Sequence, residues 1–280
     1  MIGFTLTGNW RKILETDLVF DKLRNFGCRS IELHLNPFNS AFSETLTLAR
    51  LLLKRGWNLT IHAPTDSDFN ILYYTESQDK VEFAYLTLLD VVYSLSVNYK
   101  QVILINFHGG QGTCCREELL ESACRFVHWL VPLLENRYTG LKMALELLPY
   151  DPAYIRVGDR QEDLLYVSEG LNFAHFGFCW DIGHLRRNRE LFNYGSVPKP
   201  DFIQHVIHTH VHEVDVRYRD HCPLGKGVFS ATDDLKYLLD AGYKGVYNLE
   251  LSFELAAEFG DPLEELFNSV KLLSEIIEIN

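Results

Sequence analysis

The chain lacks the long apolar stretch that a membrane span requires. No hydrophobic run approaches the roughly 18 residues that a helix needs to cross a bilayer. The first nine residues carry no basic segment and no small-residue cleavage site, so we expect a strand there rather than a signal peptide. The sequence therefore predicts a cytoplasmic protein without a membrane partner.

Paired cysteines and an excess of positive charge are also missing. The six cysteines show no C-x-x-C spacing, which favours free thiols in a reducing compartment. Lys and Arg total 26 against 38 Asp and Glu, which gives a formal net charge of −12. Because nucleic-acid binding draws on clustered Lys and Arg, this balance argues against a nucleic-acid partner.

What the chain does have is an alternation of short apolar runs with longer amphipathic stretches, which is typical of repeated β–α units. Runs rich in Val, Ile, Leu, Phe and Tyr predict eight strands: Ile2–Thr7, Ser30–His34, Asn58–His62, Gln101–Phe107, Lys142–Leu147, Phe173–Trp180, His205–Val211 and Gly245–Leu251. The amphipathic stretches predict helices over Asp17–Phe26, Glu44–Lys54, Val81–Leu95, Glu117–Leu134, Asp159–Ser168, Thr232–Ala241 and Asp261–Ile277.

Eight such units fit one α/β domain, a (β/α)8 TIM barrel over residues 1–280, because this fold typically takes about 250 residues. An open doubly wound sheet is the alternative. No G-x-G-x-x-G follows the first predicted strand to support that alternative.

Metal-binding side chains stand where six of the predicted strands end. They are His62, His108, Glu146, Asp181, His210 and Glu250. In a barrel these C-terminal ends meet at one face. A lone histidine at a strand end is more commonly a satisfied polar residue, but carboxylates that converge in a confined mouth repel each other unless a cation or proton is shared. A divalent metal ion is the simplest remedy.

The ligand types narrow the choice of ion. The oxygen-rich set with one imidazole, Glu146, Asp181, His210 and Glu250, suits Mn²⁺, Mg²⁺, Co²⁺ or Zn²⁺. Additional sites could be formed by His62 and His108 beside Glu146, and by His184 with His221. In the seventh strand His208, His210 and His212 share one face. We expect His210 to be the ligand, His208 to lie deeper and His212 to fall in the loop.

The order and spacing of several motifs resemble the xylose isomerase-like barrel superfamily over nearly the whole chain. The motifs are Ile61-His-Ala-Pro, Asn106-Phe-His-Gly-Gly, Ala144-Leu-Glu, Cys179-Trp-Asp-Ile-Gly-His, His210-Val-His-Glu, His221-Cys-Pro-Leu-Gly-Lys-Gly and Gly242-Tyr-Lys-Gly-Val-Tyr-Asn-Leu-Glu. That superfamily includes sugar-phosphate isomerases and epimerases, inosose-processing enzymes and the endonuclease IV repair nucleases.

The resemblance implies that the core metal is held by Glu146, Asp181, His210 and Glu250. In the epimerase branch the two glutamates also form the catalytic acid–base pair. Arg217 resembles that branch's substrate-binding arginine, with Arg219 as the alternative, and His184 with Arg217 would hold substrate hydroxyls. The implied partner is a small-molecule sugar or sugar phosphate. A homo-oligomer is among the expected assembly states.

The nuclease branch is the alternative and uses a three-zinc cluster with nine ligands. Eight positions here have the right residue type: His62, His108, Glu146, Asp181, His184, His210, His221 and Glu250. The ninth, an aspartate in that branch, is here Arg219, although Asp215 or Asp220 could substitute. Tyr73 and Tyr74 could act as DNA wedges, but the acidic residues around them would repel phosphate.

The isomerase or epimerase interpretation is therefore preferred, and a barrel without catalytic activity is a third possibility. The compact basic run Arg186, Arg187 and Arg189 could bind a sugar phosphate or a DNA phosphate, or lie in a solvated loop. The irregular stretch from Asn188 to Lys199 predicts a loop near the barrel mouth.

Overall fold

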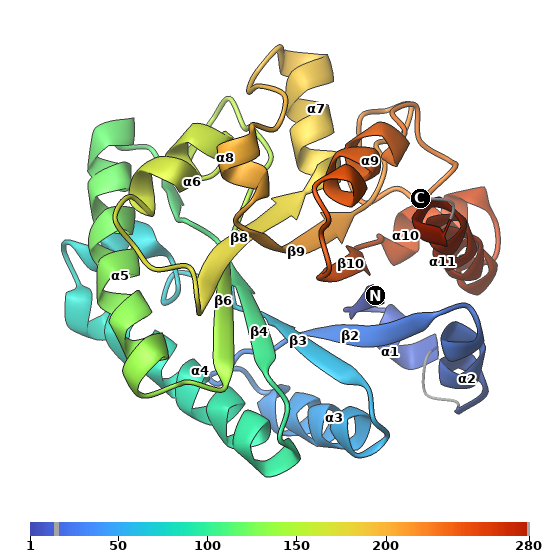
Figure 1. The fold of residues 1–280 in the computed structure, drawn as a ribbon, viewed down its shortest axis with the longest axis horizontal. Helices are drawn as coiled ribbons and strands as arrows, with labels where there is room; N and C mark the ends of the chain where they lie inside the picture. The colour runs from blue at the N-terminus through green and yellow to red at the C-terminus, as the bar shows by residue number, and fades with distance from the viewer. Residues whose placement is uncertain (14–16, 279–280) are drawn as a thin grey trace.

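The computed structural model describes residues 1–13 and 17–278. Eight parallel strands close into a barrel in the order β1-β10-β9-β8-β6-β4-β3-β2 (Figure 1). Their bounds are β1 Ile2–Leu6, β2 Cys28–His34, β3 Asn58–His62, β4 Ile103–Phe107, β6 Leu141–Glu146, β8 Phe176–Asp181, β9 Val206–Val211 and β10 Val246–Leu249. Each predicted strand overlaps one of these eight. Because β1 pairs with β10, the sheet has no open edge, so the barrel is confirmed and the doubly wound sheet is excluded.

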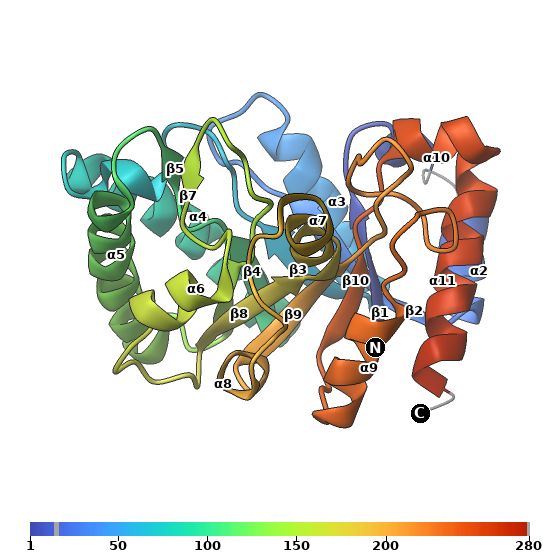
Figure 2. The same cartoon turned by 90° about the horizontal axis from the view of Figure 1, so that it is seen from above.

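Helices pack around the outside of the barrel, with α5 and α11 at opposite ends in Figure 2. The longer helices are α2 Asp17–Asn25, α3 Phe42–Lys54, α4 Gln78–Tyr99, α5 Arg116–Asn136, α6 Gln161–Val167, α7 Ile182–Phe192, α9 Thr232–Asp240, α10 Phe253–Phe259 and α11 Pro262–Glu278. Short pieces are α1 Trp10–Ile13, η1 Ile71–Tyr74 and α8 Pro200–Ile203. Outside the barrel, β5 Gln111–Gly112 pairs antiparallel with β7 Ile155–Arg156. Within the described residues, no helix is both long and apolar enough to cross a membrane.

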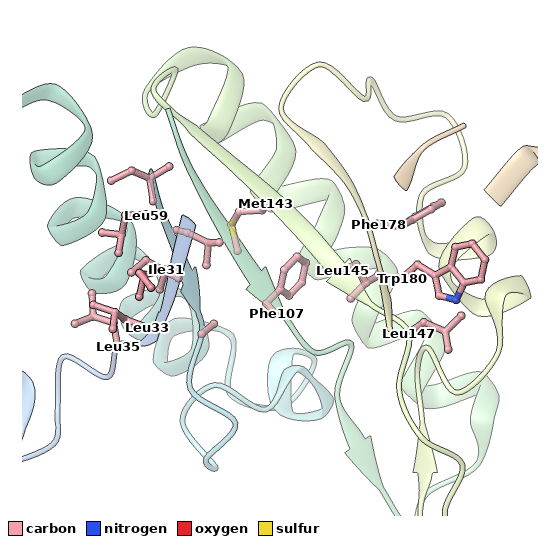
Figure 3. Close-up of a cluster of buried hydrophobic side chains, with 14 of the residues drawn as sticks. Ile31, Leu33, Leu35, Leu59, Phe107, Met143, Leu145, Leu147, Phe178 and Trp180 are labelled. Carbon is pink, nitrogen blue, oxygen red and sulfur yellow. The ribbon is translucent and has the colours of Figure 1, made fainter. Parts of the chain in front are cut away.

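The barrel strands have two different faces because successive side chains point to opposite sides. One face packs against the helices and is apolar, as Figure 3 shows for Leu33, Phe107, Met143 and Leu145. The ring of Phe107 in β4 contacts Phe126 of α5 at 6.0 Å between centroids. The alternate positions face the barrel interior and carry the polar residues of the motifs.

The prediction of a loop from Asn188 to Lys199 is wrong for its first five residues, because α7 continues to Phe192. The helix ends at Asn193, whose φ of 48° lies in the left-handed region that commonly closes a helix.

The basic run therefore lies on a helix, not in a solvated loop, and its arginines have carboxylate partners. Arg186 Nη2 lies 2.6 Å from Asp234 Oδ2 and Arg189 Nη1 lies 3.6 Å from Asp234 Oδ1. Arg187 Nε lies 3.5 Å from Asp220 Oδ1. These ion pairs join α7 to α9 and to the loop that carries Asp220.

Candidate metal centre

Four ionisable side chains from four strands converge at the C-terminal end of the barrel. Glu146 and Asp181 end β6 and β8, His210 lies in β9, and Glu250 directly follows β10. One ligand atom of each lies within 4.8 Å of the others. His210 Nδ1 lies 2.9 Å from Glu250 Oε2, 3.5 Å from Glu146 Oε1 and 3.7 Å from Asp181 Oδ2. A single imidazole nitrogen therefore faces three carboxylates.

This cluster is buried, so its negative charge must be balanced nearby. Burial alone raises the pKa of Glu146, but positive charge on His210 and His108 holds that pKa well below its ordinary value. Burial lowers the pKa of His210, but the interactions with Cys179 and with the neighbouring carboxylates outweigh it and raise that pKa well above its ordinary value. Protons on imidazoles thus supply the balancing charge in the protein by itself.

The donor set fits a divalent cation. It offers three carboxylate oxygens and one imidazole nitrogen, which is the chemistry that Mn²⁺, Mg²⁺, Co²⁺ and Zn²⁺ accept. His210 Nδ1 is buried and makes no hydrogen bond of acceptable geometry, although Glu250 Oε2 lies 2.9 Å away. A cation among these four groups would replace the imidazole protons and use that nitrogen.

The local sequence explains how Asp181 and His184 come together. Asp181 is the N-cap of α7, and its Oδ1 accepts a hydrogen bond from the backbone N–H of His184 at 2.7 Å. The cap turns the His184 ring back, so that its Nδ1 lies 3.1 Å from Asp181 Oδ2. Gly183 is needed in this turn, because a Cβ there would come within 2.0 Å of the His212 ring.

A second group adjoins the cluster through Glu146. The Nε2 atoms of His62 and His108 each lie 3.3 Å from Glu146 Oε2, and the amide of Asn106 donates to the same oxygen. His62 Nδ1 donates to the carbonyl oxygen of Ala63 at 2.8 Å, which leaves Nε2 facing Glu146. Burial lowers the pKa of His62, but hydrogen bonding to Glu146 outweighs it and raises that pKa to about 9.

A third group joins His184 and His221 to His212, which we expected only as a loop residue. The three have ligand atoms within 4.8 Å of one another. Both His212 nitrogens already have contacts, since Nε2 lies 3.0 Å from Asp181 Oδ1 and Nδ1 accepts from the backbone N–H of His221 at 2.9 Å. His212 is therefore better placed to hold Asp181 and the His221 loop than to bind an ion.

The structure does not bring Arg217 or Arg219 to this site. The Arg217 side chain is 72% exposed and lies 3.6 Å from Glu258. Arg219 forms a two-point contact with Glu258, at 2.6 and 2.7 Å, and also binds Asp215. Arg219 pairs with Asp215. Of the two aspartates considered as substitutes, Asp220 is the one that lines a cavity together with His184 and His221.

A cavity of about 300 Å³ opens next to the cluster. Its lining residues are Pro64, Thr65, Phe69, Asn70, His108, Gly110, Gln111, Leu148, Pro149, Arg156, His184, Asp220 and His221. It meets the cluster through His108 and His184, which contact Glu146, and through His221, whose Nδ1 lies 3.7 Å from Glu250 Oε2.

Arg156 is a cavity residue that the sequence analysis missed. Its Nε donates to Gln111 Oε1 at 3.1 Å, its Nη1 donates to the Pro149 carbonyl oxygen at 2.8 Å, and its Nη2 contacts Asp151 Oδ2 at 3.3 Å. These contacts hold the guanidinium at the cavity wall. Two-residue strands carry no periodic pattern, so only the pairing of β5 with β7 reveals this position.

Glu32 is a second residue that the analysis missed. It is wholly buried in the barrel interior, between His208 and His210. A signal was present, because Ser30, Glu32 and His34 alternate with apolar residues and so share the inward face of β2. The ring of His34, at the end of that face, stacks on His62 with centroids 4.3 Å apart.

Comparison with known proteins agrees with the barrel fold. A family model described as xylose isomerase-like TIM barrel matches residues 20–272. The uncharacterized protein MJ1188 of Methanocaldococcus jannaschii is 34% identical over 179 residues, which are 62% of this chain and 63% of that protein. This chain therefore covers less than two thirds of that relative.

Solved structures share the barrel. A D-tagatose 3-epimerase-like protein superposes with a TM-score of 0.68 at 18% identity, covering 99% of this chain and 97% of its own. The IOLI protein with a bound zinc atom gives a TM-score of 0.68 at 13% identity, covering 99% and 98%. At these low identities the superpositions show only a shared fold. The family match shows that the chain belongs to the xylose isomerase-like TIM barrel family.

Proposed function

We propose that this protein is a divalent-metal-dependent isomerase or epimerase that acts on a sugar or sugar phosphate. The observation that carries the proposal is the convergence of Glu146, Asp181, His210 and Glu250 beside a cavity. The epimerase-like and zinc-bound neighbours support it at the level of the fold.

The four converging residues would hold the cation, which on binding would polarise a substrate carbonyl and its neighbouring hydroxyl. Asp181 and His210 would act only as metal ligands, because both side chains are wholly buried and out of reach of a substrate. Glu250 differs from them, since its side chain is 15% exposed and stands at the edge of the cluster.

Glu146 and Glu250 would share the proton transfer. One carboxylate removes the proton from the carbon next to the carbonyl, and the electron pair of the broken C–H bond enters an enediolate. The other glutamate, in its protonated form, returns a proton to carbon. Each turnover moves one proton from the second glutamate to the first, so the pair must re-exchange protons before the next turnover.

The cavity would hold the rest of the substrate. Its volume of about 300 Å³ lies at the lower end of the range for small-molecule sites. His108, His184 and His221 present nitrogens toward hydroxyl oxygens near the cluster. Arg156 has N–H groups beyond its three protein contacts, and it is the arginine of the cavity lining that could hold a hydroxyl or phosphate oxygen.

Metal analysis of the purified protein, combined with assays on a panel of ketoses and ketose phosphates, tests the proposal. We expect about one tightly held divalent ion per chain and turnover of at least one sugar. Stripping the ion with a chelator should abolish turnover, and adding Mn²⁺, Co²⁺ or Zn²⁺ should restore it. Sugar turnover that survives complete metal removal would contradict the proposal.

A second candidate is zinc-dependent cleavage of phosphodiesters in abasic DNA. The observation in its favour is the group formed by His62 and His108 around Glu146, which could hold another zinc ion. Only Tyr73 of the two tyrosines expected to act as DNA wedges is exposed. Tyr74 is buried, and its hydroxyl donates to Glu82 at 2.8 Å. Three zinc ions per chain with incision of abasic-site DNA would favour this candidate over the first.

A further inference from the structure

A fifth carboxylate lies inside the barrel beneath the four converging groups. Glu32 Oε1 lies 3.0 Å from His210 Nε2, and its Oε2 lies 2.8 Å from His208 Nε2. Thr5 Oγ1 donates to Oε1 at 3.0 Å and Thr60 Oγ1 donates to Oε2 at 3.4 Å. Because an ionised carboxylate can only accept, both imidazoles must present an N–H to Glu32 at Nε2.

This contact determines which His210 nitrogen is free. With its proton at Nε2, a neutral His210 carries its lone pair at Nδ1, the atom that faces Glu146, Asp181 and Glu250. His62 has the reverse arrangement. Its Nδ1 donates to a backbone carbonyl oxygen and its Nε2 faces the site.

We propose that Glu32 is a positioning residue that holds His210 in the Nε2–H tautomer, so that Nδ1 is the nitrogen available to a metal ion. The proposal rests on the metal dependence proposed above and not on the identity of the substrate. Carboxylates that accept the second N–H of a ligand histidine typically contribute 10- to 100-fold to metal affinity. Here the carboxylate also bridges a second imidazole, which fixes its own orientation.

The direct test is zinc affinity, measured with Zn²⁺ alone by competition against a chromogenic chelator. Glu32→Leu removes the acceptor, and we expect zinc binding to weaken about 10- to 100-fold. Glu32→Gln keeps one acceptor oxygen for two imidazoles, so its affinity should fall between those of Glu32→Leu and the wild type. An affinity of Glu32→Leu within twofold of wild type would overturn the proposal.

The two oxygens of Glu32 provide a milder pair of variants, in which Oε1 keeps a second donor, the Asn248 amide at 3.3 Å. Thr5→Val removes a donor to Oε1, the oxygen that holds His210, and should weaken zinc binding by about 2- to 10-fold, the equivalent of one hydrogen bond. Thr60→Val removes a donor to Oε2, which holds His208, and should stay within twofold. Equal effects from both would overturn the proposal, and this pair carries the test if Glu32→Leu does not fold.

Nuclear magnetic resonance of zinc-loaded protein with ¹⁵N-labelled histidine gives a readout that a merely structural role would not change. We expect His210 to show a protonated Nε2 and a metal-bound Nδ1. Binding through Nε2 would overturn the proposal. If zinc binding follows these expectations but no sugar is turned over, the proposed function fails and the role of Glu32 stands. A wild-type protein that takes up no zinc overturns both.

Discussion

The inner and outer faces of the barrel strands are built from opposite kinds of side chain. In β4, Phe107 points outward into rings of α4 and α5, whereas its neighbour Asn106 points inward and donates to Glu146. In β2, Ile31 and Leu33 belong to the apolar layer while Glu32 between them is bound by histidines of β9. All five of these side chains are wholly buried, so burial alone does not distinguish packing from chemistry.

The outer face supplies stability and the inner face supplies reactive groups. Apolar burial of the outer face lowers the free energy of the folded state by roughly 25 cal/mol for each Å² removed from water. Polar groups on the inner face lose hydration and recover it only through contacts with each other. We therefore expect inner-face substitutions to change chemistry more than stability, and outer-face substitutions to do the reverse.

The largest effect should come from the inner face. Glu250→Gln removes a carboxylate that the proposed proton transfer requires, and kcat should fall by about 100- to 10,000-fold. The free energy of unfolding should also fall, because positive charge on His210 and His221 holds the pKa of Glu250 well below its ordinary value and the neutral amide loses that attraction. Steady-state kinetics beside urea denaturation measures both. Glu254→Gln, on exposed surface of α10, is the matched control, and an equal loss of kcat in both variants would contradict the prediction.

The outer face should give the largest change in stability. Phe107→Ala opens a cavity among the rings of Tyr85, Phe126 and Phe176, and should lower the free energy of unfolding by about 3–5 kcal/mol. Urea denaturation measures the loss. Its folded fraction should keep wild-type zinc affinity. Phe83→Ala, at a 64% exposed position, should cost far less; comparable losses would remove the distinction between the two layers.

A smaller effect distinguishes the cavity wall from the exposed surface. Arg156→Gln removes a charged donor, and KM should rise about 10- to 100-fold, as expected for one hydrogen bond from a charged group, with a smaller change in kcat. Arg217→Gln is the control, because its side chain is 72% exposed and contacts Glu258. A larger rise in KM for Arg217→Gln than for Arg156→Gln would contradict this prediction.

The smallest effect concerns the thiols, all six of which are free as predicted. Burial raises the pKa of Cys28 to about 12, so at pH 8 almost none of it is the reactive thiolate. Iodoacetamide should therefore modify the exposed Cys115 in the folded protein, and Cys28 only after unfolding. Mass spectrometry of tryptic peptides measures the difference, and rapid labelling of Cys28 in the native protein would contradict it.

The sequence predicted those features that local patterns determine. Alternation within strands and the position of strand ends were enough to predict that Glu146, Asp181 and Glu250 lie at one face of the barrel. The same alternation places Glu32 on the inward face of β2, but it could not identify the partners His208 and His210, which lie 176 and 178 residues away and meet Glu32 only when the barrel closes.

Helix α7 was missed for a related physical reason. Charged residues occupy so many of its positions that no apolar stripe of helical period stands out. The Asp181 cap is a local signal for the start of this helix, and the sequence analysis did not use it. The ion pairs of Arg186 and Arg189 with Asp234 form only in the folded chain.

The small antiparallel pair β5–β7 joins the loop after β4 to the loop after β6, and it carries Arg156 outside the sheet of the barrel. We expect changes at the cavity-lining positions of these loops, Gln111 and Arg156, to alter which molecules enter the cavity. Related proteins that differ in these loops would then differ in substrate preference while keeping the same four converging residues.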